Sequence, residues 1–398
     1  MVDPAERVGQ LPPFLGGAIR ARIRDARERG VDVISLGIGD PDQPTPDHIV
    51  EALCRAARDP AHHVYPNDLR GAPAYRHALA AWYGRRFGVE LDPDTEVISL
   101  IGSKEGNHHL ALALLNPGDV ALVPDPAYPV YESACVIAGA EVVRVPLHPD
   151  DDFLVDFETI DTDVADRAKV LWISYPNNPT AAVAPVAFFE RAVAFARRHR
   201  LVVVHDNPYS EITFDGVYAP SILEVDGARD VAIEFTSFSK TYNMAGWRLG
   251  AAVGNPAVLS AVMQVKETAD TCIFTALQAA AVAALEGPQD GIARTVEAYR
   301  RRRDLVVTGL RSALDLDVPT PQGTFYVWVP TPPGITGDEF AARLLDRAGV
   351  VVSPGIAYGQ QGANSIRISL ALDDARIAEA IERIAGARPS LLEPPAAG

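Results

Sequence analysis

Between residues 97 and 253, short apolar segments alternate with segments that have the spacing of amphipathic helices. The apolar segments are rich in Val, Ile and Leu, which is typical of β-strands. Leu201-Val202-Val203-Val204 is apolar at every position, and such a run predicts a strand that is buried on both faces. The alternation therefore predicts an α/β fold, with a mostly parallel sheet and helices on both of its faces.

We expect the strands at Val97–Ile101, Val120–Val123, Glu141–Val145, Val170–Ser174, Leu201–Asp206, Val231–Thr236 and Trp247–Val253. We expect the helices between them at Ser103–Leu115, Tyr128–Ala138 and Pro185–Arg200, the last with Pro in its first turn. In sheets of this kind, ligands bind at the carboxyl ends of the strands. Polar residues that follow these strands are therefore the candidates for a functional site.

The pattern changes after Gly287-Pro288, where a weaker alternation predicts a second, smaller α+β domain. Its helices are expected at about Gly291–Ala313, Asp338–Ala348 and Asp373–Ala385, and its strands at Thr324–Val329 and Ser365–Leu370. We expect residues 45–288 to form the large domain. Residues 1–44 and 289–398 are expected to form the small one, with a frayed tail from Arg388.

Composition excludes several classes of partner. The net charge of −16, from 36 basic and 52 acidic residues, disfavours binding to nucleic acid or to an anionic membrane. No apolar run reaches the roughly 18 residues of a membrane span, and the first 30 residues lack the apolar core of a secretory signal. The three cysteines form no C-x-x-C pair, which suits a reducing compartment, and we expect a cytoplasmic protein. No metal-binding motif is present, so we predict no metal site.

One lysine stands in a context that suits covalent chemistry. Lys240 lies between two segments that are expected to be buried, and burial lowers the pKa of an amine so that it can form an imine. Ser237 and Arg248 flank it with a hydroxyl and a guanidinium, which are good phosphate ligands. A P-loop is rejected because Ser239 stands where that motif needs Gly. An ordinary exposed lysine is the competing interpretation.

Two further segments follow strands. Asp206, at the end of the Leu201 strand, can pair with a pyridinium nitrogen and keep it protonated, and Tyr209 can donate to a ring oxygen. Asn178 offers an amide donor to a phenolate-like oxygen. Each segment is also compatible with a plain turn, because Asp, Asn and Pro favour turns.

Two more candidates lie at junctions between a strand and a helix. Ser103 and Lys104 stand at a helix N-terminus, where free backbone N–H groups bind phosphate. Tyr128 is placed to stack on a flat ring. The competing interpretations are a simple helix cap for Ser103 and a core position for Tyr128.

Taken together, these five ordered segments resemble the class I/II aminotransferases, which depend on pyridoxal 5′-phosphate (PLP) and have PLP fold type I. The resemblance covers nearly the whole chain, from Leu36-Gly37-Ile38-Gly39-Asp40-Pro41 to Ile366-Arg367-Ile368. It implies a ping-pong transfer of an amino group between an L-amino acid and a 2-oxo acid.

The resemblance also implies a role for each matching residue. Lys240 would hold the cofactor as a Schiff base, with Asp206 on the pyridine nitrogen and Tyr128 stacked on the ring. Asn178 and Tyr209 would bind the ring oxygen. The phosphate ligands would be Ser103, Lys104, Ser237 and Arg248.

Three further positions concern the substrate and a second subunit. Arg367 resembles the arginine that grips the substrate α-carboxylate, and the backbone of Gly39 would face the same group. Tyr65, in Tyr65-Pro66-Asn67, resembles the tyrosine that reaches the phosphate of the neighbouring subunit. The resemblance thus implies a homodimer with shared active sites.

Within the family, the phrases Gly102-Ser103-Lys104-Glu105-Gly106 and Ser239-Lys240-Thr241-Tyr242-Asn243-Met244 are most similar to LL-diaminopimelate aminotransferases. The chain departs from that group at Ala181, Asn207-Pro208 and Asp270-Thr271-Cys272. An aminotransferase of specialised metabolism, acting on a basic or arginine-derived amino acid in antibiotic synthesis, is the alternative. Another PLP reaction on the same fold, such as that of a lyase, racemase or cyclase, also stays open, because fold does not fix reaction type. A non-enzymatic sensor that keeps the fold is disfavoured, because every catalytic position is retained.

Overall fold

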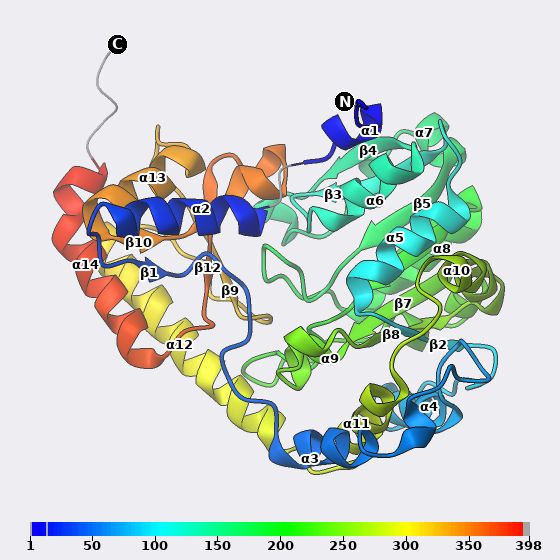
Figure 1. Ribbon diagram of the computed structural model, residues 1–398. Helices are drawn as coiled ribbons and strands as arrows, with labels where there is room; N and C mark the ends of the chain where they lie inside the picture. Colours follow the sequence, from blue (N-terminus) through cyan, green and yellow to red (C-terminus); the bar gives the residue numbers. More distant parts are fainter. Residues whose placement is uncertain (1, 13–14, 393–398) are drawn as a thin grey trace.

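A seven-stranded sheet forms the centre of the larger part of the molecule in the computed structural model, which describes residues 2–12 and 15–392 (Figure 1). In spatial order its strands are β2 (Val97–Leu100), β8 (Gly250–Gly254), β7 (Ala232–Ser237), β6 (Val202–Asp206), β5 (Ala168–Ile173), β3 (Val120–Asp125) and β4 (Glu141–Pro146). Only β8 is antiparallel to its neighbours. The predicted α/β fold with a mostly parallel sheet is confirmed.

Helices cover both faces of this sheet, because its strands are apolar on both sides. On one face lie α5 (Ser103–Leu114), α6 (Val130–Ala138) and α10 (Pro256–Ala269), which share one buried core with the sheet. On the other face lie α4 (Pro73–Phe87), α8 (Val186–His199) and α11 (Thr275–Glu286), with α3 (Asp47–Ala56) and α7 (Thr162–Arg167) nearby. This packing fixes the edge of the sheet at which β2, β3, β5, β6 and β7 all end.

The smaller part is built around the antiparallel strands β11 (Ser353–Pro354), β12 (Ser365–Ser369) and β9 (Tyr326–Pro330). Its helices are α12 (Asp290–Leu314), α13 (Gly337–Ala348) and α14 (Asp374–Leu392). Part of the N-terminal segment contacts this part: β1 (Ile34–Ser35) pairs with β10 (Val350–Val351), and α2 (Leu15–Glu28) packs on Leu345. We propose that the domain limits lie at residues 45 and 288, just before α3 and between α11 and α12.

Three local expectations were wrong. The short helix α1 (Glu6–Gly9) contacts the larger part instead of the smaller one, since Arg7 Nη1 donates to the carbonyl of Ile137 at 3.3 Å. The helix α14 continues past Arg388 to Leu392 because Leu391 is buried in the core; residues 393–398 lie outside the described part. Trp247 lies in a short 3₁₀ turn, because the positive φ of 56° at Arg248 interrupts the extended backbone before β8.

Within the described residues, no helix combines the length and the apolar character that crossing a bilayer requires.

Candidate active site

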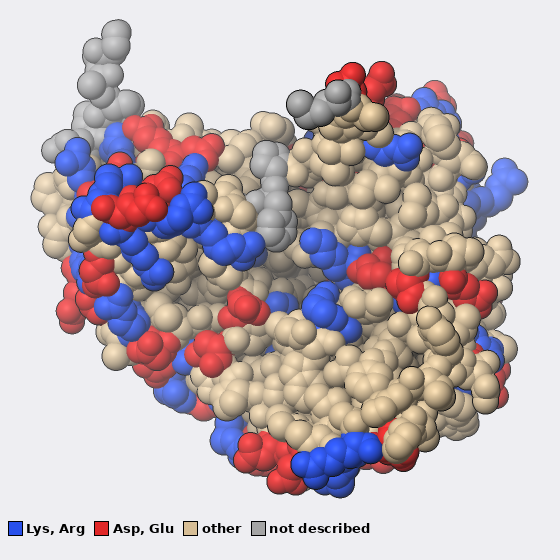
Figure 2. Space-filling model, viewed as in Figure 1, with Lys and Arg blue, Asp and Glu red and all other residues tan. Residues whose placement is uncertain are grey.

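A cavity of about 630 Å³ lies between the larger and the smaller part. Figure 2 shows the surface hollowed between the two parts, with Lys and Arg side chains beside the hollow. All but one of the predicted site residues line this cavity: Gly39, Ser103, Lys104, Tyr128, Asn178, Asp206, Tyr209, Ser237, Lys240, Arg248 and Arg367. The exception is Tyr65.

The topology explains this convergence. Asp206 and Ser237 are the last residues of β6 and β7, and Ser103 begins the helix after β2. Tyr128 follows β3 and Asn178 follows β5 in the same way. Because the carboxyl ends of parallel strands meet at one edge of a sheet, residues more than 130 positions apart come together there.

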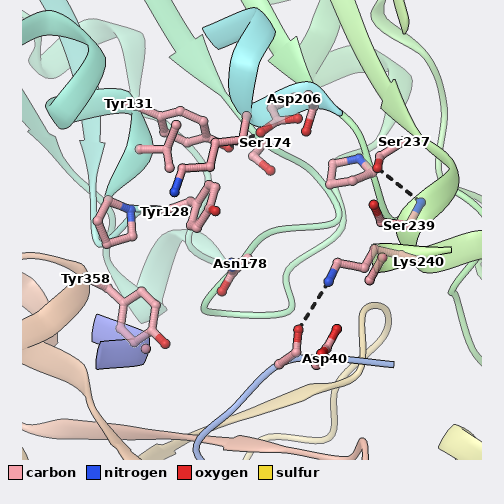
Figure 3. Close-up of a pocket in the computed structure, with 18 of the residues that line it drawn as sticks. Asp40, Tyr128, Tyr131, Ser174, Asn178, Asp206, Ser237, Ser239, Lys240 and Tyr358 are labelled. Carbon is pink, nitrogen blue, oxygen red and sulfur yellow. Dashed lines mark hydrogen bonds between the residues drawn. The ribbon is translucent and has the colours of Figure 1, made fainter. Parts of the chain in front are cut away.

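Lys240 lies in α9 (Phe238–Thr241), directly after β7, and reaches toward the smaller part (Figure 3). Its Nζ donates to the carbonyl oxygen of Gly39 at 3.1 Å and lies 5.3 Å from the centre of the Phe325 ring. Burial lowers the pKa of the Lys240 amine, as the sequence predicts. A lowered pKa increases the neutral, nucleophilic fraction of the amine at neutral pH.

Asp206 is buried at the end of β6, in the same cavity, with its two oxygens in different surroundings. Oδ2 accepts hydrogen bonds from Tyr131 Oη at 3.0 Å and from Asn107 Nδ2 at 3.4 Å. Oδ1 is buried and has no hydrogen-bond partner among the described residues. Burial raises the pKa of Asp206 to about 6, against the lowering effect of the Tyr131 hydrogen bond. An unpaired buried carboxylate oxygen is costly, so this site suits a ligand with a cationic N–H.

Two cations gather where α5 begins. Burial lowers the pKa of Lys104, and the positive charge of Arg248 lowers it further. The Arg248 guanidinium crosses so close to Gly102 that a Cβ there would lie 2.6 Å from Nη2, which explains a glycine with φ of 71° at that position. Ser103 and Ser237 add hydroxyls beside these cations. Two neighbouring cations at a helix N-terminus suit a dianion such as a phosphate ester.

Arg367, on β12, connects the smaller part to the larger one. Its Nη1 donates to Asn178 Oδ1 at 2.7 Å, and its Nη2 donates to the carbonyl of Gly37 at 3.3 Å. Nε is buried without a hydrogen-bond partner among the described residues. Because Oδ1 of Asn178 already accepts a hydrogen bond from Arg367, the amide nitrogen of Asn178 is the group left to act as the donor that the sequence predicts.

Tyr326 is the main site residue that the sequence analysis missed. The guanidinium of Arg367 lies 3.9 Å above its ring, and Tyr209 Oη donates to its hydroxyl at 3.3 Å. A side chain at Gly39 would overlap the Tyr326 hydroxyl, which explains why a residue without a Cβ stands there. No sequence pattern marks Tyr326, because an aromatic residue in a strand is typical of a core.

Tyr131, Asn107 and Tyr358 were missed as well, although each faces predicted site residues. Asn107 lies four residues after Ser103 in a predicted helix, so helical spacing alone could have placed both on one face. Tyr131 follows Tyr128 by three residues in the same way. The sequence contains no comparable signal for Tyr358.

Tyr65 lies outside the cavity, and 82% of its surface is exposed. Val64 and Phe274 are exposed nearby, and the ring of Phe274 lies 6.4 Å from that of His63. These residues form an apolar surface patch, which we call the Tyr65 patch (Val64, Tyr65 and Phe274). Exposed apolar groups of this kind are typical of interaction surfaces.

One cluster of possible metal ligands occurs in the described part of the chain, at Glu105, His109 and Asp270. Lys266 is buried within it, and its Nζ lies 3.2 Å from Glu105 Oε1 and 2.6 Å from Asp270 Oδ1. The single ammonium therefore pairs with both carboxylates and offsets one of their two charges, and we interpret the cluster as an ion-pair network.

Comparison with known proteins identifies the family. The family model described as "Aminotransferase class I and II" matches residues 31–384. The chain belongs to the class I and II aminotransferases. It is 51% identical over 381 residues to an LL-diaminopimelate aminotransferase of Dehalococcoides mccartyi, covering 96% of this chain and 98% of the relative. It is 53% identical over 382 residues to the enzyme of that name from Desulforudis audaxviator, covering 96% and 97%.

Solved structures have the same fold over nearly the whole chain. A substrate-bound structure of BacF from Bacillus subtilis has a TM-score of 0.94 at 39% identity and covers 99% of both chains. A probable N-succinyldiaminopimelate aminotransferase from Thermus thermophilus has a TM-score of 0.89 at 38% identity, covering 94% of this aminotransferase and 100% of that chain. PLP fold type I is therefore confirmed.

Aminotransferases of this family depend on PLP, and the cavity fits that cofactor. Asp206 Oδ1 is the unpaired acceptor that a protonated pyridine nitrogen needs. Lys104 and Arg248 are two neighbouring cations that would suit the phosphate, and Lys240 is an amine with a lowered pKa. The volume of the cavity leaves room for a cofactor and a small amino acid.

Proposed function

We propose that this aminotransferase takes the amino group of LL-diaminopimelate and passes it to a 2-oxo acid by a ping-pong mechanism. The observation that carries the reaction is the unpaired Asp206 Oδ1, which opens on the same cavity as Lys240. The substrate is supported by identities of 51% and 53% to two LL-diaminopimelate aminotransferases, over 96% of this chain in both cases.

Bound PLP supplies an electron sink for the bond to the substrate α-carbon. Asp206 would hold a proton on the ring nitrogen through Oδ1, while Tyr131 and Asn107 fix its other oxygen. With PLP bound, the amide nitrogen of Asn178 would donate to the ring oxygen, and the Tyr209 hydroxyl would turn from Tyr326 to do the same. Lys240 Nζ would accept and return the proton of the substrate α-carbon, since burial lowers its pKa and so increases the neutral fraction that can accept a proton.

The charges along the cavity suit a substrate with two carboxylates. Arg367 offers a rigid fork for the α-carboxylate, with Tyr326 supporting its plane. Arg20 also lines this cavity, so a cation besides Arg367 and the phosphate ligands faces it. LL-Diaminopimelate carries a carboxylate at each end, and such a lining favours it over a monocarboxylic basic amino acid.

The first experiment follows the visible absorbance of the PLP-loaded protein as amino donors are added one at a time. We expect LL-diaminopimelate to bleach the band stoichiometrically and a 2-oxo acid to restore it. Arginine and lysine serve as matched basic controls. Bleaching by these amino acids but not by LL-diaminopimelate would refute the substrate and favour the specialised-metabolism alternative. If the protein consumed the substrate while the visible absorbance band stayed unchanged, transamination would be refuted.

We also infer that the enzyme works as a homodimer in the cytoplasm. The exposed Tyr65 patch is the surface through which Tyr65 would reach the phosphate site of the partner subunit. All three cysteines are free, which favours a reducing compartment.

Tyr65→Phe is expected to keep the dimer but to weaken PLP binding by about tenfold, since one hydrogen bond to a charged group is lost. Sedimentation velocity and PLP titration of the cofactor-free protein measure the two effects. Tyr218→Phe, at a partly exposed tyrosine that bonds Glu224, is the matched control. A monomeric wild type, or unchanged affinity in Tyr65→Phe, would contradict this role.

A further inference from the structure

Behind Asp206, on the opposite face of the sheet, lies a buried pair of ionisable residues that the proposed mechanism does not use. His205 precedes Asp206 on β6, and its backbone position is paired with Glu234 on β7. Both side chains are fully buried. His205 Nδ1 lies 2.8 Å from Glu234 Oε2, and its ring packs on Phe189 of α8. Because successive side chains of a strand face opposite ways, His205 faces α8 while Asp206 faces α5 and α6.

The hydrogen bonds define the protonation of the imidazole. His205 Nε2 faces the carbonyl oxygen of Tyr175 at 2.9 Å, and a carbonyl only accepts, so Nε2 carries a proton. The other nitrogen, Nδ1, faces the Glu234 carboxyl group. Which of the two groups holds the shared proton is decided by the remaining partners of Glu234.

Glu234 is surrounded by donors. Oε1 accepts from Tyr83 Oη at 2.8 Å, and Oε2 accepts from Ser221 Oγ at 2.8 Å and from the Ile222 amide at 3.2 Å. With His205 Nδ1–H as the fourth donor, the number of donors equals the roughly four acceptor sites of an ionised carboxylate. These contacts suit an ionised Glu234 beside an imidazole with a proton on both ring nitrogens.

We propose that His205 and Glu234 are positioning residues: their ion pair holds the Asp206 carboxylate ionised and fixes the turn that carries Asn178. This inference rests on the proposed function, because Asp206 and Asn178 matter here as contacts of the PLP ring. The imidazolium reaches Asn178 through the Tyr175 carbonyl, three residues before it, and reaches Asp206 through its own backbone. Glu234 lies on the strand that ends at Ser237, three residues before Lys240.

A gain in folding stability does not explain well why a buried ion pair stands at this position. Removing two charges from water costs several kcal/mol per ion, and apolar residues of similar volume often stabilise a core as well or better. What an apolar pair cannot supply is a fixed positive charge next to Asp206. That charge favours the ionised carboxylate, and His205 accordingly contributes to lowering the pKa of Asp206 against the larger effect of burial.

Other ionisable groups also face these residues. Glu234 meets Tyr83 from α4, and Tyr175 contributes only its carbonyl to His205. Asp206 meets Tyr131 from α6, while Lys240 and Arg248 line the cavity beside it. Burial raises the pKa values of Tyr83 and Tyr131, so neither titrates near neutral pH. A change in the pH dependence near pH 6 therefore reports on Asp206, beside the phosphate of the cofactor, which titrates in the same range in wild type and variants alike.

The test uses Glu234→Gln, which keeps the shape but removes the carboxylate, and His205→Gln/Glu234→Gln, which removes both charges together. For each cofactor-free protein, the dissociation constant of PLP is measured from pH 5 to 9, alongside thermal unfolding. For the double variant, which lacks the positive charge, we expect affinity at pH 7.5 to fall by about tenfold and the acid midpoint of binding to rise by about one pH unit. His199→Gln is the matched control, because His199 pairs with Asp166 on the same side of the sheet but away from the cavity. It is expected to leave both quantities unchanged.

Unchanged affinity and midpoint in the folded double variant would overturn the proposal. If the variants do not fold, ¹⁵N NMR of histidine-labelled wild type decides: two protonated ring nitrogens on His205 at pH 8 support the pair, and one protonated nitrogen refutes it. A wild type that binds no PLP would instead refute the proposed function, so the two failures are distinguishable.

Discussion

Lys240→Ala is expected to lose transaminase activity by about 10⁴-fold, because the variant lacks both the covalent attachment point and the base that moves the α-proton. The loss is measured as turnover with LL-diaminopimelate and a 2-oxo acid. The cavity itself stays intact, since the substitution only shortens a side chain in a site that already holds Phe325 and Gly39. The variant should therefore fold with a wild-type unfolding temperature and still bind PLP without a covalent bond.

Borohydride reduction of the PLP-loaded wild type provides a direct check. The peptide that contains Lys240 should gain the mass of the reduced cofactor, and no peptide of Lys240→Ala should gain it. Lys169→Ala is the matched control, because Lys169 is a surface lysine that pairs with Asp119. A reduced cofactor found on another lysine, or normal turnover by Lys240→Ala, would contradict the assignment.

Asp206→Asn is expected to lower turnover by about 10²- to 10³-fold, because the neutral amide cannot keep the ring nitrogen protonated. Oδ2 contacts Tyr131 and Asn107 in the wild type, so the isosteric amide fits the same space. Wild-type turnover in this variant would show that the ring nitrogen needs no carboxylate partner.

The pH dependence of PLP binding also reports on the carboxyl group of Asp206. Burial raises the pKa of Asp206 to about 6 in the protein without cofactor, so the carboxylate is charged above that pH and neutral below it. PLP affinity of the wild type should therefore fall as the pH decreases through about 6. Asp206→Asn should retain only the change that comes from the phosphate, which also titrates near pH 6.

The folding stability of the cofactor-free protein changes with pH in the opposite direction from its PLP affinity. A folded-state pKa above the unfolded value means that the folded protein takes up a proton between about pH 6 and 4 that the unfolded chain does not. The cofactor-free wild type should gain stability from this group as the pH falls through that window. At pH 8, Asp206→Asn should therefore unfold at a higher temperature than the wild type, in the absence of PLP.

Much of the cavity could be predicted because chain-local patterns placed its residues. Asp206, Ser237 and Tyr128 each follow an apolar run, and the rule that parallel strands end at one edge brings such residues together. The strand positions followed from composition because burial on both faces leaves few polar residues in them. The fold of the larger part was predictable for the same reason.

The remaining contacts depend on distant pairings that no local pattern encodes. Tyr326 enters the cavity from β9, more than 110 residues after Tyr209, and only the packing of the two parts brings them together. His205 and Glu234 are joined by the register of β6 and β7, which the sequence does not specify. The extension of α14 to Leu392 likewise reflects one buried leucine against a core formed elsewhere.

The hydrogen bond from Arg367 to Asn178 has a consequence for selectivity among amines. It spans the gap between the smaller part and the larger one, so the guanidinium is already aimed before any substrate arrives. A molecule that carries a carboxylate next to its amine gains from this orientation at little entropic cost. A simple alkylamine has no carboxylate to pair with the guanidinium, so Nε of Arg367 stays buried without a partner. Binding of such an amine is therefore disfavoured, even though its amino group could reach Lys240.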